Sequence, residues 1–110
     1  MKIGIVGSRS LECNNIEIYI PKECSEIISG GAKGIDSCVA NYAKAKNIKL
    51  TEILPEYKKY GRAAPLVRNK IIVESSDRLV VFWDGKSKGT KFVIDYAAKI
   101  KKTCIVINKS

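Results

Sequence analysis

Five short apolar runs alternate with segments of helical periodicity along this 110-residue chain, and this alternation limits the possible folds more than any other feature. Each run reads as a buried strand, and the intervening patterns read as helices. Strands that alternate with helices in so short a chain predict right-handed crossovers and a mainly parallel sheet. The expected strands cover residues 2–7, 25–31, 48–57, 77–83 and 103–108. The sequence therefore predicts one α/β domain over residues 1–110, a three-layer sandwich with strand order 3-2-1-4-5.

The expected helices occupy residues 34–47, 65–76 and 91–102, where apolar side chains recur at helical spacing. Residues 11–24 have an ambiguous pattern that we interpret as a short helix. Residues 58–65 are interpreted as a loop, because Gly61 and Pro65 interrupt any regular element there.

Cysteine and histidine content limits the chemistry. The four cysteines form no CxxC pair and the chain has no histidine, so no zinc site of ordinary spacing is expected and neither a metal nor a cofactor is predicted. Without histidine, Ser-His-Asp and Cys-His nucleophile pairs are excluded. We expect reduced cysteines, with Cys38 and Cys104 buried as small hydrophobic side chains.

Charge indicates the class of partner. Twenty Lys and Arg residues oppose eleven Asp and Glu residues, which gives a formal charge of +9. Such an excess favours nucleotides, nucleic acid or acidic surfaces, although lysines spread along helix faces are also common on ordinary solvated surfaces. No apolar run approaches the roughly 20 residues that span a bilayer, and the first ten residues do not resemble a signal peptide. We expect a cytoplasmic protein without membrane contact.

Three Gly-rich polar segments leave the expected strands at one edge of the sheet. They are "GSRS" after the first strand, "SGGAKGID" after the second and "FWDGKSKGT" at the end of the fourth. Ligands of such sheets bind outside the carboxyl ends of the strands, where the strand order reverses. Glycines allow close approach, and the free amides of a helix start attract anions. These segments predict a phosphate site, but their spacing is neither GxGxxG nor that of a P-loop.

Several side chains in these segments have two open interpretations. Ser87 can cap a helix, bind phosphate, or do both. Arg9 can bind phosphate bidentately or form a surface salt bridge. Asp36 and Asp84 can accept hydrogen bonds from ribose hydroxyls or stabilise helix starts. Trp83 can stack on a base, although an aromatic residue at a strand end more often completes a core.

The order of "GSR", "SGGAKGID", "RN" in a later helix and "FWDGKSKGT" resembles the SLOG superfamily over nearly the whole chain. That superfamily is named for the DNA-uptake protein DprA/Smf and the LOG cytokinin-activating enzymes, and the closest resemblance is to its small stand-alone YspA-like branch. The resemblance implies a Rossmann-like fold that binds nucleotides, nucleotide derivatives or, in DprA-type members, single-stranded DNA. The ligand-contacting positions that it implies are Gly7, Ser8, Arg9, Gly30, Gly31, Gly34, Asp36, Arg68, Asn69, Asp84, Ser87, Gly89 and Thr90. We expect one of Arg68 and Asn69 to turn toward the site.

Three functions remain open at this stage. The leading hypothesis is a module that binds a nucleotide or a nucleotide-derived phosphorylated molecule as sensor, carrier or sequestering protein. The first alternative is a LOG-type hydrolase of the N-glycosidic bond of a nucleoside 5′-monophosphate. The catalytic Glu of that family corresponds to Val93 here, and Asp95 lies roughly 200° around the helix, so only Asp36 and Asp84 remain as weak catalytic candidates. The second alternative is binding of single-stranded nucleic acid, and a homodimer is possible in each case.

Overall fold

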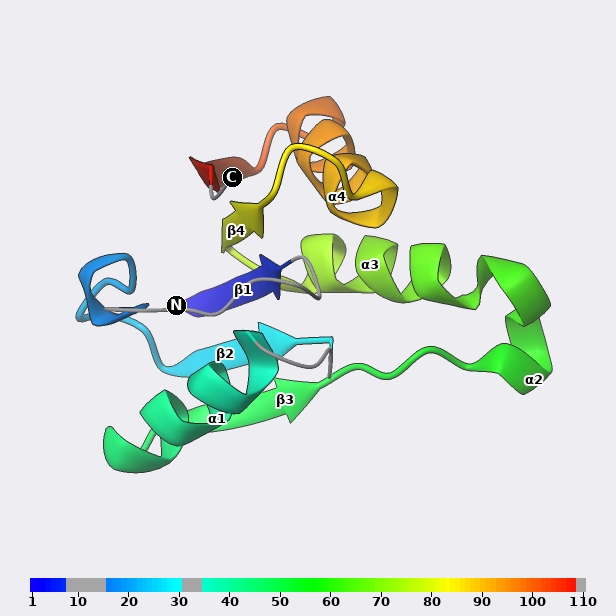
Figure 1. Cartoon of the computed structure of the whole chain (residues 1–110). Coiled ribbons are helices and arrows are strands. Elements are labelled where there is room, and N and C mark those ends of the chain that lie inside the picture. Colours follow the sequence, from blue (N-terminus) through cyan, green and yellow to red (C-terminus); the bar gives the residue numbers. More distant parts are fainter. Residues whose placement is uncertain (8–15, 31–34, 109–110) are drawn as a thin grey trace.

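The computed structural model describes residues 1–7, 16–30 and 35–108. Its centre is a five-stranded sheet, and Figure 1 shows how the helices are arranged around it. All four strand pairings are parallel, and the strand order is β3-β2-β1-β4-β5. The strands are β1 (Lys2–Gly7), β2 (Glu26–Ser29), β3 (Lys49–Glu52), β4 (Arg78–Trp83) and β5 (Thr103–Asn108). The predicted sheet and its order are therefore confirmed.

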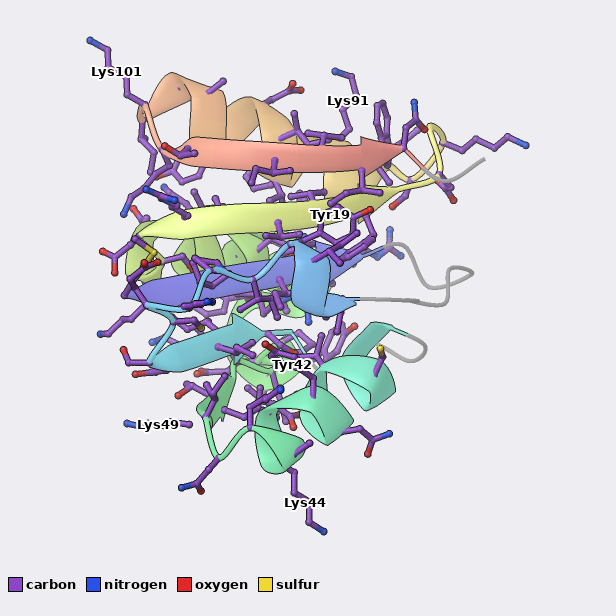
Figure 2. The ribbon with its side chains drawn as sticks, turned by 90° about the vertical axis from the view of Figure 1, so that its left-hand side faces the viewer. Tyr19, Tyr42, Lys44, Lys49, Lys91 and Lys101 are labelled. Carbon is purple, nitrogen blue, oxygen red and sulfur yellow. The ribbon has the colours of Figure 1, made fainter. Side chains whose placement is uncertain are left out.

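Helices lie on both faces of the sheet and complete a Rossmann-like three-layer α/β fold. The helical elements are the 3-10 turns η1 (Ile16–Ile18) and η2 (Gly61–Ala63) and the α-helices α1 (Ile35–Ala45), α2 (Tyr57–Tyr60), α3 (Ala64–Ser75) and α4 (Lys88–Lys99). Figure 2 shows α1 and the segment around η1 in front of the β1–β3 part of the sheet. Helices α3 and α4 lie behind the sheet and contact each other.

The core divides into two apolar clusters, one on each face of the sheet. Ile3, Val80 and Phe82 belong to the cluster beneath α1, whereas Leu79 and Val81 belong to the cluster beneath α3 and α4. Successive β4 side chains point to opposite faces, and both faces are buried, which explains the nearly continuous apolar sequence of this strand.

Gly4 lets the end of α3 pack directly against β1. A Cβ atom at Gly4 would lie 2.3 Å from Ser76 Oγ and 2.8 Å from Leu79 Cδ2. Ser76 has little freedom to move, because it is fully buried and its hydroxyl donates to the Ile72 carbonyl at 2.6 Å. A side chain at position 4 would therefore force the helix away from the strand.

Several predicted elements differ from the structure in their bounds or their kind. The third strand ends at Glu52, three residues before Pro55, and the predicted loop at 58–65 contains α2 and η2. One helical turn is too short to produce a periodic pattern, but Gly61 does end α2, with a positive φ of 57° that favours glycine. Helix α4 begins at Lys88 rather than at residue 91.

The helix predicted at 11–24 is wrong for its described part, where only the η1 turn is helical. Ile16 and Ile20 are buried, whereas Ile18 is 68% exposed. The isoleucines of this stretch alternate with polar residues and do not form a helical stripe. The remainder of the prediction, residues 11–15, lies outside the described residues.

The expectation of reduced cysteines is also wrong in part, because Cys38 is disulfide-bonded. Cys24 and Cys104 are free thiols, and burial raises the pKa of both. Cys13 lies outside the described residues. Pairing of cysteines depends on tertiary proximity, which cysteine spacing alone does not reveal.

Within residues 1–7, 16–30 and 35–108, no helix is both long enough and apolar enough to cross a membrane.

Candidate ligand-binding site

The predicted site lies at the edge of the sheet where the strands end, and the structure brings three of the strand exits together there. Gly7 pairs with Phe82, so β1 and β4 leave the sheet side by side at the point where the strand order reverses. Gly30 directly follows β2, the neighbour of β1 on the other side. This is the position at which doubly wound sheets bind ligands.

Arg68 reaches this edge from α3. Its Nη1 donates to the Gly30 carbonyl, and its Nε donates to Asn69 Oδ1 at 2.8 Å. A Cβ atom at Gly30 would lie only 2.8 Å from Arg68 Nη1. Glycine is therefore needed for the guanidinium to lie across the end of β2. Arginine carries its charge at every physiological pH, so a permanent cation stands at the strand ends.

Asn69 connects the same helix to the start of α4. Its Nδ2 donates to the Gly89 carbonyl at 3.4 Å, while its Oδ1 accepts from Arg68. The side chain is buried, with 7% of the residue exposed. We expected one of Arg68 and Asn69 to turn toward this edge, and both contact backbone there. Asn69 joins α3 to the start of α4.

The turn before α4 is fixed by two polar side chains. Asp84 Oδ1 accepts from the backbone amides of Lys86 and Ser87, both at 2.8 Å. Ser87 is the N-cap, and its hydroxyl accepts from the Thr90 amide at 3.4 Å. These contacts assign a capping role to Ser87 and a helix-start role to Asp84, two of the alternatives that the sequence left open.

Two amides remain available at the start of α4. The backbone N–H groups of Lys88 and Gly89 have no hydrogen-bond acceptor among the residues that the structure describes. The first turn contains no acidic residue. Unpaired amides at a helix start carry partial positive charge and bind anions. The sequence had singled out Gly89 here, but not the Lys88 amide, which only the observed start of α4 reveals.

Three further residues clarify what the site can do. Trp83 packs against the core cluster beneath α4, and its Nε1 donates to the Ser87 carbonyl at 3.0 Å, so it supports the turn. Val93 is fully buried in the same cluster. Asp95 lies on the exposed side of α4 and pairs with Lys91 at 3.2 Å. Neither position supplies a carboxylate to the site.

The described part of the site contains Gly7, Gly30, Arg68, Asn69, Asp84, Ser87, Gly89 and the buried Thr90. Ser8, Arg9, Gly31 and Gly34 lie outside the described residues. Asp36 belongs to the first turn of α1, but its side chain is likewise outside what the structure describes. One cavity between residues 18–21 and strands β1, β4 and β5, and another between residues 20–24 and the end of α1, both lie away from this edge.

Within the described ranges, no group of three Cys, Asp or Glu side chains is arranged to hold a metal ion. The chain matches no protein-family model, and neither the curated proteins nor the solved structures include one that is significantly similar to it. The functional argument therefore depends on the geometry of the site.

Proposed function

We propose that this protein binds a nucleotide or a nucleotide-derived phosphorylated molecule at the carboxyl edge of its sheet, as a sensor, carrier or sequestering module. One observation carries the proposal. Arg68 and the unpaired amides of Lys88 and Gly89 lie at the same edge of the sheet, where the strand order reverses. Asn69 joins the segments that provide these groups. Charge-assisted hydrogen bonds from an arginine, together with the amides of a helix start, suit phosphate oxygens.

The proposal favours binding over turnover. The family resemblance requires a glutamate at the position of Val93, which is buried in the core, and Asp95 is paired with Lys91 on the exposed helix face. Asp84 is engaged with two backbone amides. A LOG-type hydrolase remains the alternative, and release of a free base from nucleoside monophosphates would establish it. We further propose that the chain is a cytoplasmic, divergent relative of the SLOG superfamily.

Calorimetric titration with AMP, cyclic AMP and ADP-ribose tests the binding proposal. We expect at least one of these compounds to bind, and Arg68→Gln to weaken its affinity by about tenfold, since a hydrogen bond to a charged group contributes about 1.5–3 kcal/mol. The matched control is Arg78→Gln, because Arg78 lies at the opposite end of β4. Failure of all three compounds to bind at millimolar concentration, or equal losses in both variants, would contradict the proposal.

A separate observation supports single-stranded nucleic acid as a second candidate. Helix α2 projects beyond the strand ends (Figure 1), and none of the residues of α2 and η2 is buried. Tyr57 and Tyr60 are 56% and 37% exposed, and they alternate with Lys58, Lys59 and Arg62. Exposed aromatic rings beside cations are the groups on which sequence-tolerant binders stack bases.

Fluorescence anisotropy with a labelled oligothymidine tests this second candidate. Affinity should fall with salt at a logarithmic slope of about −0.7 per contacted phosphate. The double variant Tyr57→Ala/Tyr60→Ala should bind more weakly, whereas Tyr96→Phe, which keeps the ring of a tyrosine on α4, should not. Absence of binding at low salt, or binding that the double variant leaves unchanged, would exclude a role for α2.

A further inference from the structure

One half of a sheet face has no helix over it. Figure 2 shows α1 in front of the β1–β3 side of the sheet, whereas no described helix lies in front of β4 and β5. Parallel sheets are ordinarily covered on both faces, and β5 has the apolar sequence "TCIVIN" of a covered strand. Ile105 on β5 is nevertheless 44% exposed. This face therefore has apolar surface that the described chain does not cover.

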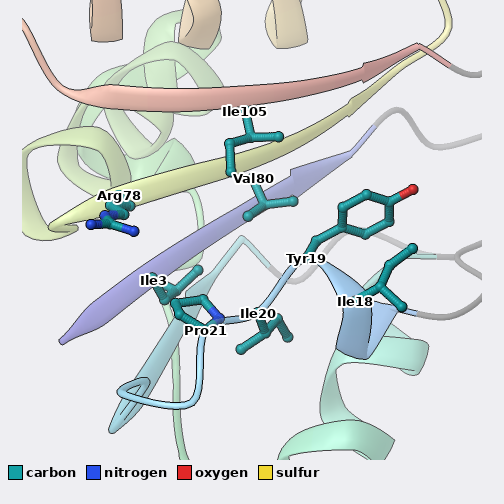
Figure 3. A pocket seen from close by; sticks show the side chains of 8 residues that line it. All are labelled: Ile3, Ile18, Tyr19, Ile20, Pro21, Arg78, Val80 and Ile105. Atoms are coloured by element: carbon teal, nitrogen blue, oxygen red, sulfur yellow. The ribbon is translucent and has the colours of Figure 1, made fainter.

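A cavity of about 220 Å³ lies on this face, between the segment 18–21 and strands β1, β4 and β5 (Figure 3). Its floor is fully buried and apolar, formed by Ile3 and Val80. Its rim contains Ile18 and Ile105, which are 68% and 44% exposed. A concave apolar lining with a few polar groups is the usual form of a small-molecule site.

Polar groups stand at the two ends of this cavity. Arg78 lies at one end and Tyr19 at the other (Figure 3). The guanidinium of Arg78 has no hydrogen bond, ion pair or ring contact with any residue in the described part of the chain. The Tyr19 ring packs edge-on against Phe82, with 5.7 Å between ring centroids. The lining thus combines an apolar surface with a single unpaired cation.

We propose that this groove binds a small organic acid with a compact apolar body and one carboxylate, which pairs with Arg78. In liquid water each molecule occupies about 30 Å³, and the atoms of an organic molecule are packed more tightly than that. A cavity of this volume therefore suits a ligand of roughly ten non-hydrogen atoms. A second copy of the chain fits less well, because it would remove the unpaired Arg78 from water and would bring together two chains of charge +9. The site is separate from the proposed nucleotide site, since Arg78 begins β4 and that site lies where β4 ends.

Methyl NMR of the isoleucine side chains tests this proposal with 3-phenylpropionate as the probe and 3-phenylpropan-1-ol as its uncharged counterpart. We expect the Ile18 and Ile105 methyl resonances to shift on addition of the acid, with a dissociation constant of about 1 mM for a ligand of this size. The alcohol should bind about tenfold more weakly. In Arg78→Gln the acid and the alcohol should bind equally, whereas Arg68→Gln should retain the preference for the acid.

Three results would overturn the proposal. The first is the absence of shifts at these methyl groups with 20 mM acid, and the second is equal binding of acid and alcohol to the unmodified protein. The third is a shift of the same methyl groups with protein concentration alone, which would identify a second copy as the occupant. Because Arg78 is exposed, its replacement should not prevent folding, and a thermal melt of the variant verifies this. Failure of nucleotide binding would not affect this proposal, because the two sites share no residue.

Discussion

Replacing Asn69 by Asp separates the structural role of this residue from its place beside the proposed anion site. The aspartate keeps an acceptor for Arg68 Nε, but its second oxygen replaces the 3.4 Å bond to the Gly89 carbonyl with a buried contact between two acceptors, so stability should fall by about 1–3 kcal/mol. The new carboxylate would stand beside the Lys88 and Gly89 amides. For charges roughly 6 Å apart and an effective dielectric constant of about 40, Coulomb's law gives about 1.4 kcal/mol per unit charge. This energy corresponds to a tenfold loss of affinity for a monoanion and a larger loss for a phosphate dianion.

The assay is calorimetric titration with whichever nucleotide binds the unmodified protein, accompanied by thermal melts. Asn47→Asp is the matched control, because it adds the same charge at an exposed position before β3, at the opposite edge of the sheet. Asn69→Ala removes both hydrogen bonds without adding charge, and we expect a smaller loss of affinity from it. If Asn69→Asp and Asn47→Asp bind the nucleotide equally well, the anion does not lie at the start of α4.

Four further outcomes follow from particular contacts. Gly4→Ala should lower stability by about 3 kcal/mol and the melting temperature by about 10 °C, measured by calorimetry, because its Cβ would meet a buried serine hydroxyl at 2.3 Å. Gly30→Ala should weaken nucleotide binding by displacing the guanidinium of Arg68, yet change stability by less than about 1 kcal/mol, because that side-chain end can shift. The Lys2 backbone amide donates to Asp77 and lowers the pKa of this carboxyl group below its ordinary 3.8. The resulting stabilisation is present above pH 3.8 and is lost as the pH falls further. In Asp77→Asn the melting temperature should therefore fall less steeply with acidification, as thermal melts at a series of pH values would measure. In denaturant, Cys38 should resist iodoacetamide until a reductant is added, as peptide mass spectrometry would detect.

The sheet could be predicted from the sequence because β1, β4 and β5 are apolar runs of the length that a parallel strand requires. β1 and β5 were predicted with their observed bounds, and the predicted strand order is the one that is common among doubly wound sheets. The errors fall where local pattern is weak. A single turn such as α2 lacks periodicity, and the start of α4 depends on the Ser87 cap rather than on an apolar stripe.

The candidate site was predictable in its location but not in its connections. Gly-rich segments at strand ends indicated the edge of the sheet, because this topology brings those ends together. No pattern in the sequence relates Arg68 to Gly30 or Asn69 to Gly89, since those contacts depend on how α3 lies behind the sheet. The disulfide of Cys38 was not predicted either, because cysteine pairing also depends on tertiary contacts.

The turn before α4 has a consequence for kinetics. Asp84, Ser87 and Trp83 hold this turn through hydrogen bonds within the protein itself. The conformational entropy of ordering these residues is thus lost during folding and not during association. An anion that docks on the Lys88 and Gly89 amides would meet a preorganised surface, so this part of the site would add no slow rearrangement to the encounter.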